Sequence, residues 1–177
     1  MKLKRRNVLQ DNEILLRAPE PSDVDFLYQL ENNTDNWEVS ETLLPFSKQL
    51  LKTFILQQND IHSTKQYRWI IHLTTKDCPV GCVDLYNYDP LHRRAGVGII
   101  ISPDFQKNGY ASKALHLIEK YANNTLKLHQ LFCLIHEKNN KSRALFESLN
   151  YINTGIQKDW YFNGKDFDDV LFYQKMF

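Results

Sequence analysis

The sequence predicts an α/β (α+β) fold in which a mixed central sheet is flanked by helices. Short apolar runs rich in β-branched residues, such as Ile99-Ile100-Ile101 and residues 131–135, are typical of buried strands. Other segments repeat apolar residues every three or four positions, as amphipathic helices do. The 177 residues contain no internal repeat, low-complexity tract or second-domain boundary. A single domain over residues 1–177 is therefore expected, with residues 1–12 as a candidate flexible N-terminal tail.

The first half of the chain is expected to contain one strand, two helices and then three strands. Two serines are good N-cap candidates: Ser22 for a helix from residue 23 to about 32, and Ser47 for one that runs to about residue 58. The apolar face of the second helix is expected to hold Leu50, Leu51, Phe54 and Ile55. The strands are expected at residues 13–17, 67–73, 80–86 and 94–101.

The second half is expected to continue as a helix, a strand, a helix and two strands. The first of these helices follows Gly109, and the second runs from residue 141 to 149 with Asn139 as its N-cap. Its inward face is expected to hold Ala144, Leu145 and Leu149. The strands are expected at residues 131–135, 151–162 and 169–177, and the dipeptide Asn163-Gly164 favours a hairpin between the last two.

The junction between the strand at 94–101 and the following helix carries the clearest chemical signal. Ser102-Pro103 ends the strand, because proline has no N–H for the ladder. Gly109 can adopt backbone angles closed to other residues and lets a ligand approach the main chain. A strand, a tight loop and a helix N-terminus direct several free N–H groups and a positive dipole end at one place. The pattern therefore indicates a site for an anion such as pyrophosphate.

Two motifs give the chain a family resemblance. One is Gln106-x-x-Gly109-x-Ala111 at this junction, and the other is Asn139-x-x-Ser142-x-x-x-Phe146-x-x-Leu149 about thirty residues later. With the apolar strand before them, they resemble the GNAT N-acetyltransferases. Within that family, His92-Arg93-Arg94-Ala95 is most similar to the spermidine/spermine N-acetyltransferases and next to the ribosomal-protein N-terminal acetyltransferases. The resemblance covers nearly the whole length and implies the GNAT acyl-CoA N-acyltransferase fold.

The resemblance also implies that the cofactor is acetyl-CoA. It places the pantetheine arm along the main chain of the apolar strand, like an added strand, and the pyrophosphate in the following loop. It places Asn139 at the pantetheine or thioester end, a role that a plain helix cap does not exclude. The residues implied in cofactor binding are Ile99, Ile100, Ile101, Gln106, Lys107, Asn108, Gly109, Tyr110, Ala111, Ser112 and Asn139.

Two positions that are catalytic in many relatives are changed. The place of the tyrosine acid is Phe146, and the place of the glutamate base is Gly96. A CoA thiol with a pKa near that of free cysteine, about 8.5, leaves as thiolate with little help. The missing base matters more, because an amine with a pKa of about 10.4 is neutral only about once in 2,500 molecules at pH 7.

Two residues are candidates for the missing base. Asp84, at the end of the strand before the 87–93 loop, is the first candidate for the base or for an anchor of the amine; a structural partnership with Arg93 or Arg94 is the alternative. His92 is the second candidate, because a histidine with an unperturbed pKa near 6.5 can act as a general base at neutral pH. A loop histidine is also commonly a plain surface residue.

An acidic stretch, residues 31–41, falls between the first two helices, where the family builds its acceptor site. Its four acids have no balancing base and would attract a polycation. A solvated helix end and loop is the alternative. The candidate substrate-binding residues are Glu31, Glu38, Glu41 and Asp84.

Composition and charge argue against several classes of function. A net charge of +1 gives no whole-molecule field for nucleic acid or anionic lipid. The apolar runs are far shorter than the roughly 20 residues of a membrane span. The three cysteines fit no zinc spacing, and Cys82 and Cys133 are expected to be apolar fillers within strands. We therefore expect a cytoplasmic protein without a metal site, in contact with neither nucleic acid nor membrane.

Three functions remain open. The first is an acetyl-CoA-dependent N-acetyltransferase that acts on a primary amine, with a polyamine-like small cationic amine favoured. The second acetylates protein N-termini, as the ribosomal-protein enzymes do. The third is a non-catalytic acyl-CoA-binding module, which Gly96 and Phe146 keep open. The expected partners are a small-molecule amine or a peptide N-terminus, and a homo-oligomer is a candidate assembly.

Overall fold

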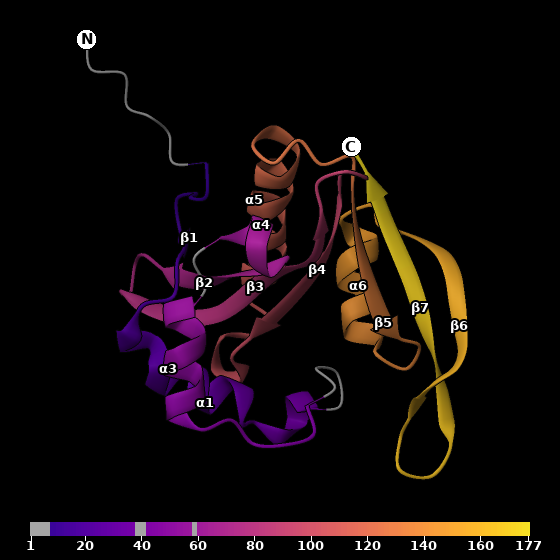
Figure 1. Ribbon diagram of the computed structural model, residues 1–177, viewed down its shortest axis with the longest axis horizontal. Coiled ribbons are helices and arrows are strands. Elements are labelled where there is room, and N and C mark those ends of the chain that lie inside the picture. Colours follow the sequence, from indigo (N-terminus) through magenta and orange to yellow (C-terminus); the bar gives the residue numbers. More distant parts are fainter. Residues whose placement is uncertain (1–7, 38–41, 58–59) are drawn as a thin grey trace.

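A seven-stranded mixed sheet forms the centre of the structure, a computed structural model that describes residues 8–37, 42–57 and 60–177 (Figure 1). The strand order is β1-β2-β3-β4-β5-β7-β6, and all neighbours are antiparallel except the parallel pair β4–β5. The mixed sheet that the sequence predicts is thus confirmed. The strands are β1 (Ile14–Arg17), β2 (Tyr67–Leu73), β3 (Cys78–Asp89), β4 (Arg94–Ile101), β5 (Gln130–His136), β6 (Ile152–Phe162) and β7 (Phe167–Met176).

Helices cover both faces of this sheet. Buried side chains of α1 and α3 pack with Ile70, Cys82 and Ile100 on one face, and those of α5 pack with the larger core on the other. The helices are α1 (Val24–Glu31), α3 (Lys48–Gln57), α4 (Ile61–Thr64), α5 (Tyr110–Asn124) and α6 (Asn140–Ser148), with 3₁₀ turns η1 (Pro21–Asp23), η2 (Thr34–Asn36) and η3 (Pro103–Phe105). None of the described helices is long and apolar enough to span a membrane.

Strands β4 and β5 part soon after they meet. Their register holds for three residue pairs, Arg94 with Gln130, Ala95 with Leu131 and Gly96 with Phe132. Beyond Gly96 strand β5 continues to pair with β7 as far as His136 and Val170. In the described part of the chain, the edge of β4 from Val97 to Ile101 is therefore left without a strand partner on the β5 side. A wedge opens there in the middle of the sheet.

The wedge explains one departure from the sequence-based expectation. The run Ile99-Ile100-Ile101 predicts a strand buried on both faces, yet only Ile101 is buried and the other two are half-buried. The missing neighbour strand leaves their edge open. The apolar run thus marks the wall of an opening as well as part of the core.

Helix N-caps at Ser47 and Asn139 are confirmed, and the one at Ser22 is wrong. The Leu50 amide donates to Ser47 Oγ (3.1 Å), and the Ser142 amide donates to Asn139 Oδ1 (3.0 Å). At the first helix, the turn η1 intervenes, so that Glu20 is the N-cap of η1 and Asp23 stands at the N-cap position of α1. The reason is Asp23, whose carboxylate accepts from the Glu20 amide (2.8 Å) and so closes the turn before α1 begins.

Two predicted helix faces need correction. Ala144 in α6 is exposed and Phe146 is buried in its place, since the inward stripe runs through residues 145, 146 and 149. In α3, Leu51 and Ile55 are buried, whereas Leu50 lies toward the rim of a pocket described below and is 53% exposed. Strand β3 is also longer than expected, because it pairs with β2 from Cys78 and with β4 to Asp89.

The expected N-terminal tail lies only partly within the described residues. Residues 1–7 lie outside them. Residues 8–12 are tied to β1, because the Leu16 amide donates to the Leu9 carbonyl (2.8 Å) and Gln10 forms a β-bridge with Leu15. The tied part is therefore a short extension of the sheet.

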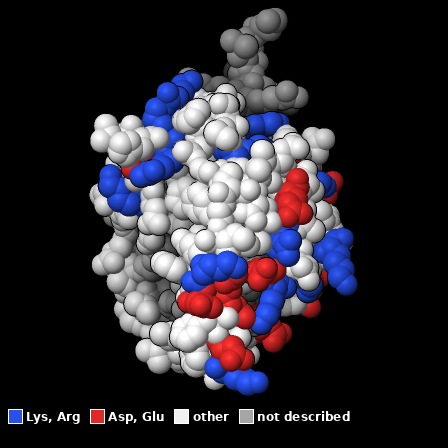
Figure 2. All heavy atoms as spheres, turned by 90° about the vertical axis from the view of Figure 1, so that its right-hand side faces the viewer, with Lys and Arg blue, Asp and Glu red and all other residues white. Residues whose placement is uncertain are grey.

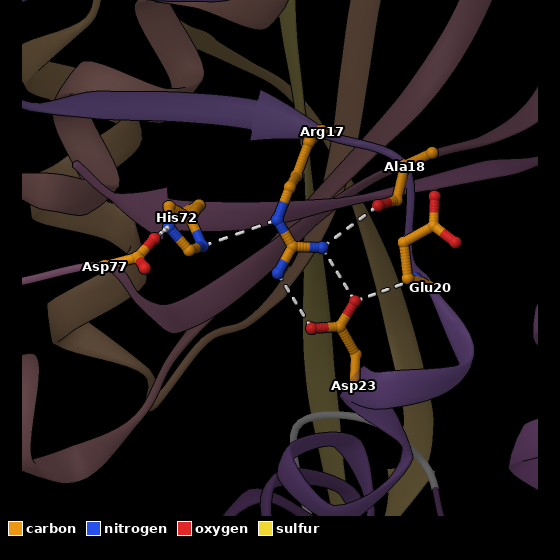
Figure 3. Close-up of polar contacts among 6 residues, drawn as sticks. All are labelled: Arg17, Ala18, Glu20, Asp23, His72 and Asp77. Atoms are coloured by element: carbon orange, nitrogen blue, oxygen red, sulfur yellow. Dashed lines mark hydrogen bonds and ion pairs between the residues drawn. The ribbon is translucent and has the colours of Figure 1, made fainter.

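A partly buried ion pair fixes the start of α1 to the end of β1 (Figure 3). The Arg17 guanidinium donates two hydrogen bonds to the Asp23 carboxylate (2.7 and 2.8 Å) and a longer one to His72 Nδ1 (3.4 Å). Burial alone would raise the pKa of Asp23, but the donors from Arg17 and the Glu20 amide hold it below its ordinary value. Helix α1 is thereby held against the sheet.

Candidate active site

The wedge beside β4 is one side of a cleft of about 690 Å³, which we call the β4 cleft. The N-termini of α5 and α6 form its other walls. All but Asn108 of the eleven cofactor-binding residues predicted from the sequence line it. The structure thus brings together two motifs that are about thirty residues apart in the chain.

The loop before α5 is held open by its own side chains. The Gln106 side chain donates to the Ile101 carbonyl (3.1 Å), and the Asn108 side chain donates to the carbonyls of Phe105 and Gln106 (3.1 and 3.0 Å). Lys107 and Gly109 both have left-handed backbones, with φ of 63° and 78°. These turns direct the main chain along the cleft, so Asn108 contributes to the loop's shape and does not line the cleft.

The amides at the start of α5 make the cleft suitable for an anion. The first amide of this helix that finds a backbone acceptor in the described structure is that of Lys113, which donates to the Gly109 carbonyl (3.1 Å). The preceding amides are the donors that a helix N-terminus leaves unsatisfied, and they lie at the positive end of the helix dipole. Lys107 and Lys141 also line the cleft. A pyrophosphate fits this set of donors and charges.

The rest of the cleft suits an extended chain with amide groups. The unpaired edge of β4 offers main-chain donors and acceptors like those of a sheet edge. Asn139 caps α6 with its side-chain oxygen, and its side-chain NH₂ has no hydrogen-bond partner among the described residues. Both roles expected of Asn139 are therefore compatible. The residues present fit the pantetheine arm that the family resemblance implies.

A second cavity of about 340 Å³ lies between the α1/α3 pair and strands β2 and β3, and we call it the Arg68 pocket. Its floor holds three charged side chains, and its walls are mostly apolar. The lining residues are Glu31, Phe46, Leu50, Leu51, Phe54, Gln66, Tyr67, Arg68, Asp84, Leu85 and Tyr86.

Arg68 joins the two carboxylates of this pocket. Its Nε and one terminal nitrogen donate to the two oxygens of Asp84 (2.8 and 2.7 Å), and the other terminal nitrogen donates to Glu31 Oε1. The Phe54 ring lies over the guanidinium, 5.7 Å from its Cζ atom. Burial alone would lower the pKa of Arg68, but Asp84 and Glu31 raise it well above its ordinary value, so the side chain stays charged.

The β4 cleft and the Arg68 pocket meet at β4. Asp84 is directly opposite Gly98 in the β3–β4 register, so the two backbones are about 5 Å apart. Ile100 lines the cleft and also packs against the α1/α3 cluster beside the pocket. An acyl group in the wedge and an amine in the pocket would therefore approach each other across Gly98.

Tyr86 accounts for the glycine at the family's usual base position. A Cβ atom added to Gly96 would lie 2.2 Å from Cε2 and 2.4 Å from Cζ of the Tyr86 ring. Tyr86 also lines the Arg68 pocket and packs edge-on against Phe132. The phenol therefore fills the place from which a glutamate side chain would project.

The remaining predicted residues have different positions. Glu31 and Asp84 come together in the Arg68 pocket, whereas Glu38 and Glu41 lie outside the described residues. His92 is exposed in the turn before β4, and its amide donates to Asp89 Oδ1 (2.9 Å). It lines neither cavity, and the strand from Arg94 to Ile99, about 17 Å long, lies between its turn and the cleft. Phe146 is 4% exposed and packs edge-to-face on Tyr151.

Sequence reasoning missed Arg68 and Tyr86. Arg68 is opposite Asp84 in the β2–β3 register, and it shares a sheet face with Ile70 two residues later. Because side chains alternate along a strand, the sequence alone places Arg68 and Ile70 on the same face. The pairing of Arg68 with Asp84 depends on the register between two strands. Tyr86 is opposite Gly96 in the same way.

Comparison with known proteins agrees with this geometry. A family model described as an acetyltransferase (GNAT) domain matches residues 13–151. The spermidine N(1)-acetyltransferase of Escherichia coli (strain K12) is 27% identical over 160 residues, covering 87% of this chain and 81% of that protein. A putative ribosomal N-acetyltransferase of Bacillus subtilis is 30% identical over 93 residues, covering 52% of this chain and 51% of that protein.

Solved structures show the same fold. The spermidine N-acetyltransferase of Vibrio cholerae in complex with CoA and spermine superposes with a TM-score of 0.85 at 23% identity, covering 94% of this chain and 96% of that one. Another structure of the Vibrio cholerae enzyme, with a TM-score of 0.78 at 23% identity, covers 94% of this chain and 95% of that one and is described as dodecameric.

Proposed function

The chain belongs to the GNAT acetyltransferase family, and on that premise we propose that it transfers the acetyl group of acetyl-CoA to a primary amine of a polyamine-like small cation. The observation that carries this proposal is the junction at Gly98. An anion-binding cleft with an open strand edge lies on one side of it, and a pocket with two carboxylates lies on the other. The spermidine acetyltransferases among the relatives support the choice of amine.

Residues of the β4 cleft hold the cofactor in this proposal. The free amides before Lys113, with Lys107 and Lys141, bind the pyrophosphate. The open edge of β4 would pair with the pantetheine arm, and the Asn139 NH₂ would be a donor for its thioester end. Acetyl-CoA supplies the activated acyl group.

Asp84 and Glu31 hold the amine in this proposal. Asp84 is the closer of the two to β4, because it is paired with Gly98 in the register. It accepts a hydrogen bond from the substrate ammonium and receives or relays its proton, directly or through water. Asp84 is also bound by Arg68, which favours its role as an anchor of the ammonium over that of a strong base. With Phe146 at the usual acid position, the thiolate leaves without a proton from the protein.

An acetyl-CoA-dependent amine screen with detection of free thiol tests the proposal. The panel contains spermidine, single amino acids, aminoglycosides and peptides with free N-termini, with heat-denatured protein as the control. We expect the highest kcat/KM for spermidine and related small amines. If no amine in the panel raises the rate of free-thiol release above the rate without amine, the proposed function is contradicted.

Protein N-terminal acetylation is the second candidate function. The similarity to the ribosomal N-acetyltransferase of Bacillus subtilis favours it. The apolar walls of the Arg68 pocket at Phe46, Leu50 and Phe54 would suit an apolar first side chain. The peptides of the same screen separate the two functions. If the protein acetylates N-termini, kcat/KM should be higher for peptides than for spermidine.

We also propose a homo-oligomer in the cytoplasm. Strand β6 is a sheet edge whose residues Ile152, Ile156, Trp160 and Phe162 are each more than half exposed. Figure 2 shows a broad uncharged area on the side of the molecule that carries β6 and β7, bordered by groups of charged residues. An edge of this kind readily pairs with another chain. Light scattering during gel filtration measures the oligomeric state.

The cytoplasmic location is supported by the cysteines. All three are free thiols, as expected in a reducing compartment.

A further inference from the structure

Arg68 changes the charge of the pocket that would receive the amine. Glu31 and Asp84 carry two negative charges, and Arg68 contributes one positive charge. The described residues that line the Arg68 pocket therefore hold one net negative charge. Without Arg68, the same described residues would hold two net negative charges.

The surroundings make this charge balance strong. The side chains of Arg68, Glu31 and Asp84 are 19%, 11% and 28% exposed. Apolar walls from α3 and the segment before it, including Phe46, Leu51 and Phe54, enclose them. Charges in such a partly buried site interact more strongly than charges in water, and salt screens them less.

The geometry of Arg68 also occupies the oxygens that ammonium groups would use. The guanidinium binds both oxygens of Asp84 and one oxygen of Glu31. Two carboxylates that would each accept an ammonium group are thus bridged by one internal cation. A planar guanidinium in bidentate contact holds this arrangement more firmly than a lysine ammonium would.

We propose that Arg68 is a specificity-determining residue that limits the Arg68 pocket to one ammonium group at a time. The inference rests on the proposed function and names the substrate class more closely. The favoured amine places its reacting ammonium beside Asp84 on an apolar arm, and any further positive charge remains outside the pocket. A short diamine that must bring both charges inside is disfavoured.

A pair of amines of equal size tests this proposal. Pentylamine and 1,4-diaminobutane have the same number of heavy atoms and differ by a second ammonium group in place of a methyl group. The readout is the ratio of kcat/KM for the diamine to that for the monoamine, at saturating acetyl-CoA and fixed ionic strength. The ratio of the two Kd values, from calorimetry with CoA present, is measured in parallel.

Three variants form a charge series, and a fourth serves as the control. Counted over the described residues that line the pocket, Arg68→Gln leaves two net negative charges, Glu31→Gln leaves none, and the double variant restores one. We expect the ratio to rise about tenfold or more in Arg68→Gln, to fall below the parent in Glu31→Gln, and to return to within about threefold of the parent in the double variant. Lys165→Gln removes an exposed charge in the β6–β7 loop and is expected to leave the ratio unchanged.

The outcomes separate this inference from the proposed function. If Arg68→Gln folds and its ratio equals that of the parent, the inference is overturned. If Arg68→Gln does not fold, the inference requires that the diamine-to-monoamine ratio fall in Glu31→Gln and return to near the parent value in the double variant. Any other result for these two variants overturns it. If no amine is acetylated, the proposed function fails, and the Kd ratios still decide the role of Arg68. If the variants bind neither amine, the role of the pocket is itself refuted.

Discussion

The proposed binding groups of the β4 cleft are mainly main-chain groups, whereas those of the Arg68 pocket are side chains. In the cleft, the proposed ligand-binding groups are the amides at the start of α5 and the open edge of β4, whereas the Gln106 side chain shapes the loop. In the Arg68 pocket, the candidate binding groups are the carboxylates of Glu31 and Asp84, with the Arg68 guanidinium between them. Most substitutions should therefore leave the cleft working, unless they change its backbone angles. A single substitution in the pocket should change which amine is used.

The largest effect is expected where the cleft depends on a special backbone angle. Gly109→Val should weaken CoA binding by about a hundredfold or more, because a β-branched residue is strained at a φ of 78° and would move the loop. A Cβ there would meet no protein atom within 4 Å, so crowding within the protein is not the cause. Calorimetry with CoA measures the effect. Unchanged affinity would refute the cofactor assignment.

Gly164 offers a matched control for this substitution. It also has a left-handed backbone (φ of 93°) with no protein atom within 4 Å of an added Cβ, but it lies in the β6–β7 loop. Gly164→Val should lose stability while CoA affinity stays within about twofold of the parent. Equal losses of affinity in both variants would show that the effect is global.

The next largest effect should come from the side-chain site. Asp84→Asn keeps the size of the side chain and removes the charge, so kcat/KM for the amine should fall by about tenfold or more, a change of about 1.4 kcal/mol in the barrier. Affinity for CoA should remain unchanged. Higher pH should partly restore the rate, because solvent then supplies more neutral amine.

Asp77→Asn is the control for this charge removal. Asp77 is an almost fully exposed acid in the β2–β3 turn. Its variant should match the parent in kcat/KM. A pH–rate profile of Asp84→Asn that overlays that of the parent would exclude Asp84 as base and as anchor.

A smaller effect, on stability, tests whether α1 is held as the ion pair suggests. Asp23→Asn should reduce the free energy of unfolding by about 1 kcal/mol at pH 7. The folded-state pKa of Asp23 lies below its ordinary value of 3.8. The charged pair therefore stabilises the fold fully above pH 4, and this stabilisation is lost as the pH falls through the folded-state value. Urea unfolding at pH 7 and pH 3 should show a smaller difference between variant and parent at pH 3.

The smallest effect is expected at Phe146. Because the thiolate can leave without an acid, Phe146→Tyr should leave turnover within about twofold of the parent or raise it slightly. Thermal unfolding shows whether the buried position tolerates a hydroxyl. Loss of turnover in a fully stable variant would contradict the equivalence of Phe146 to the usual tyrosine position.

The contrast between cleft and pocket also explains what the sequence could predict. The cleft follows from local patterns: an apolar run, Ser-Pro, a glycine before a helix and an asparagine cap each specify a backbone shape nearby. The pocket depends on the registers that place Arg68 against Asp84 and Tyr86 against Gly96. Those registers depend on the packing of the whole sheet. The sequence therefore predicts Glu31 and Asp84 as candidates, but it does not predict the arginine between them.

The short contact between β4 and β5 has a mechanical consequence. Along the sheet, the half formed by β1 to β4 and the half formed by β5, β7 and β6 are joined through three residue pairs. A ligand strand seated in the wedge would lengthen this seam and couple the two halves. Amide hydrogen exchange at residues 97–101 would then slow when CoA binds. The two halves of the sheet would unfold together, whereas without CoA each could unfold separately.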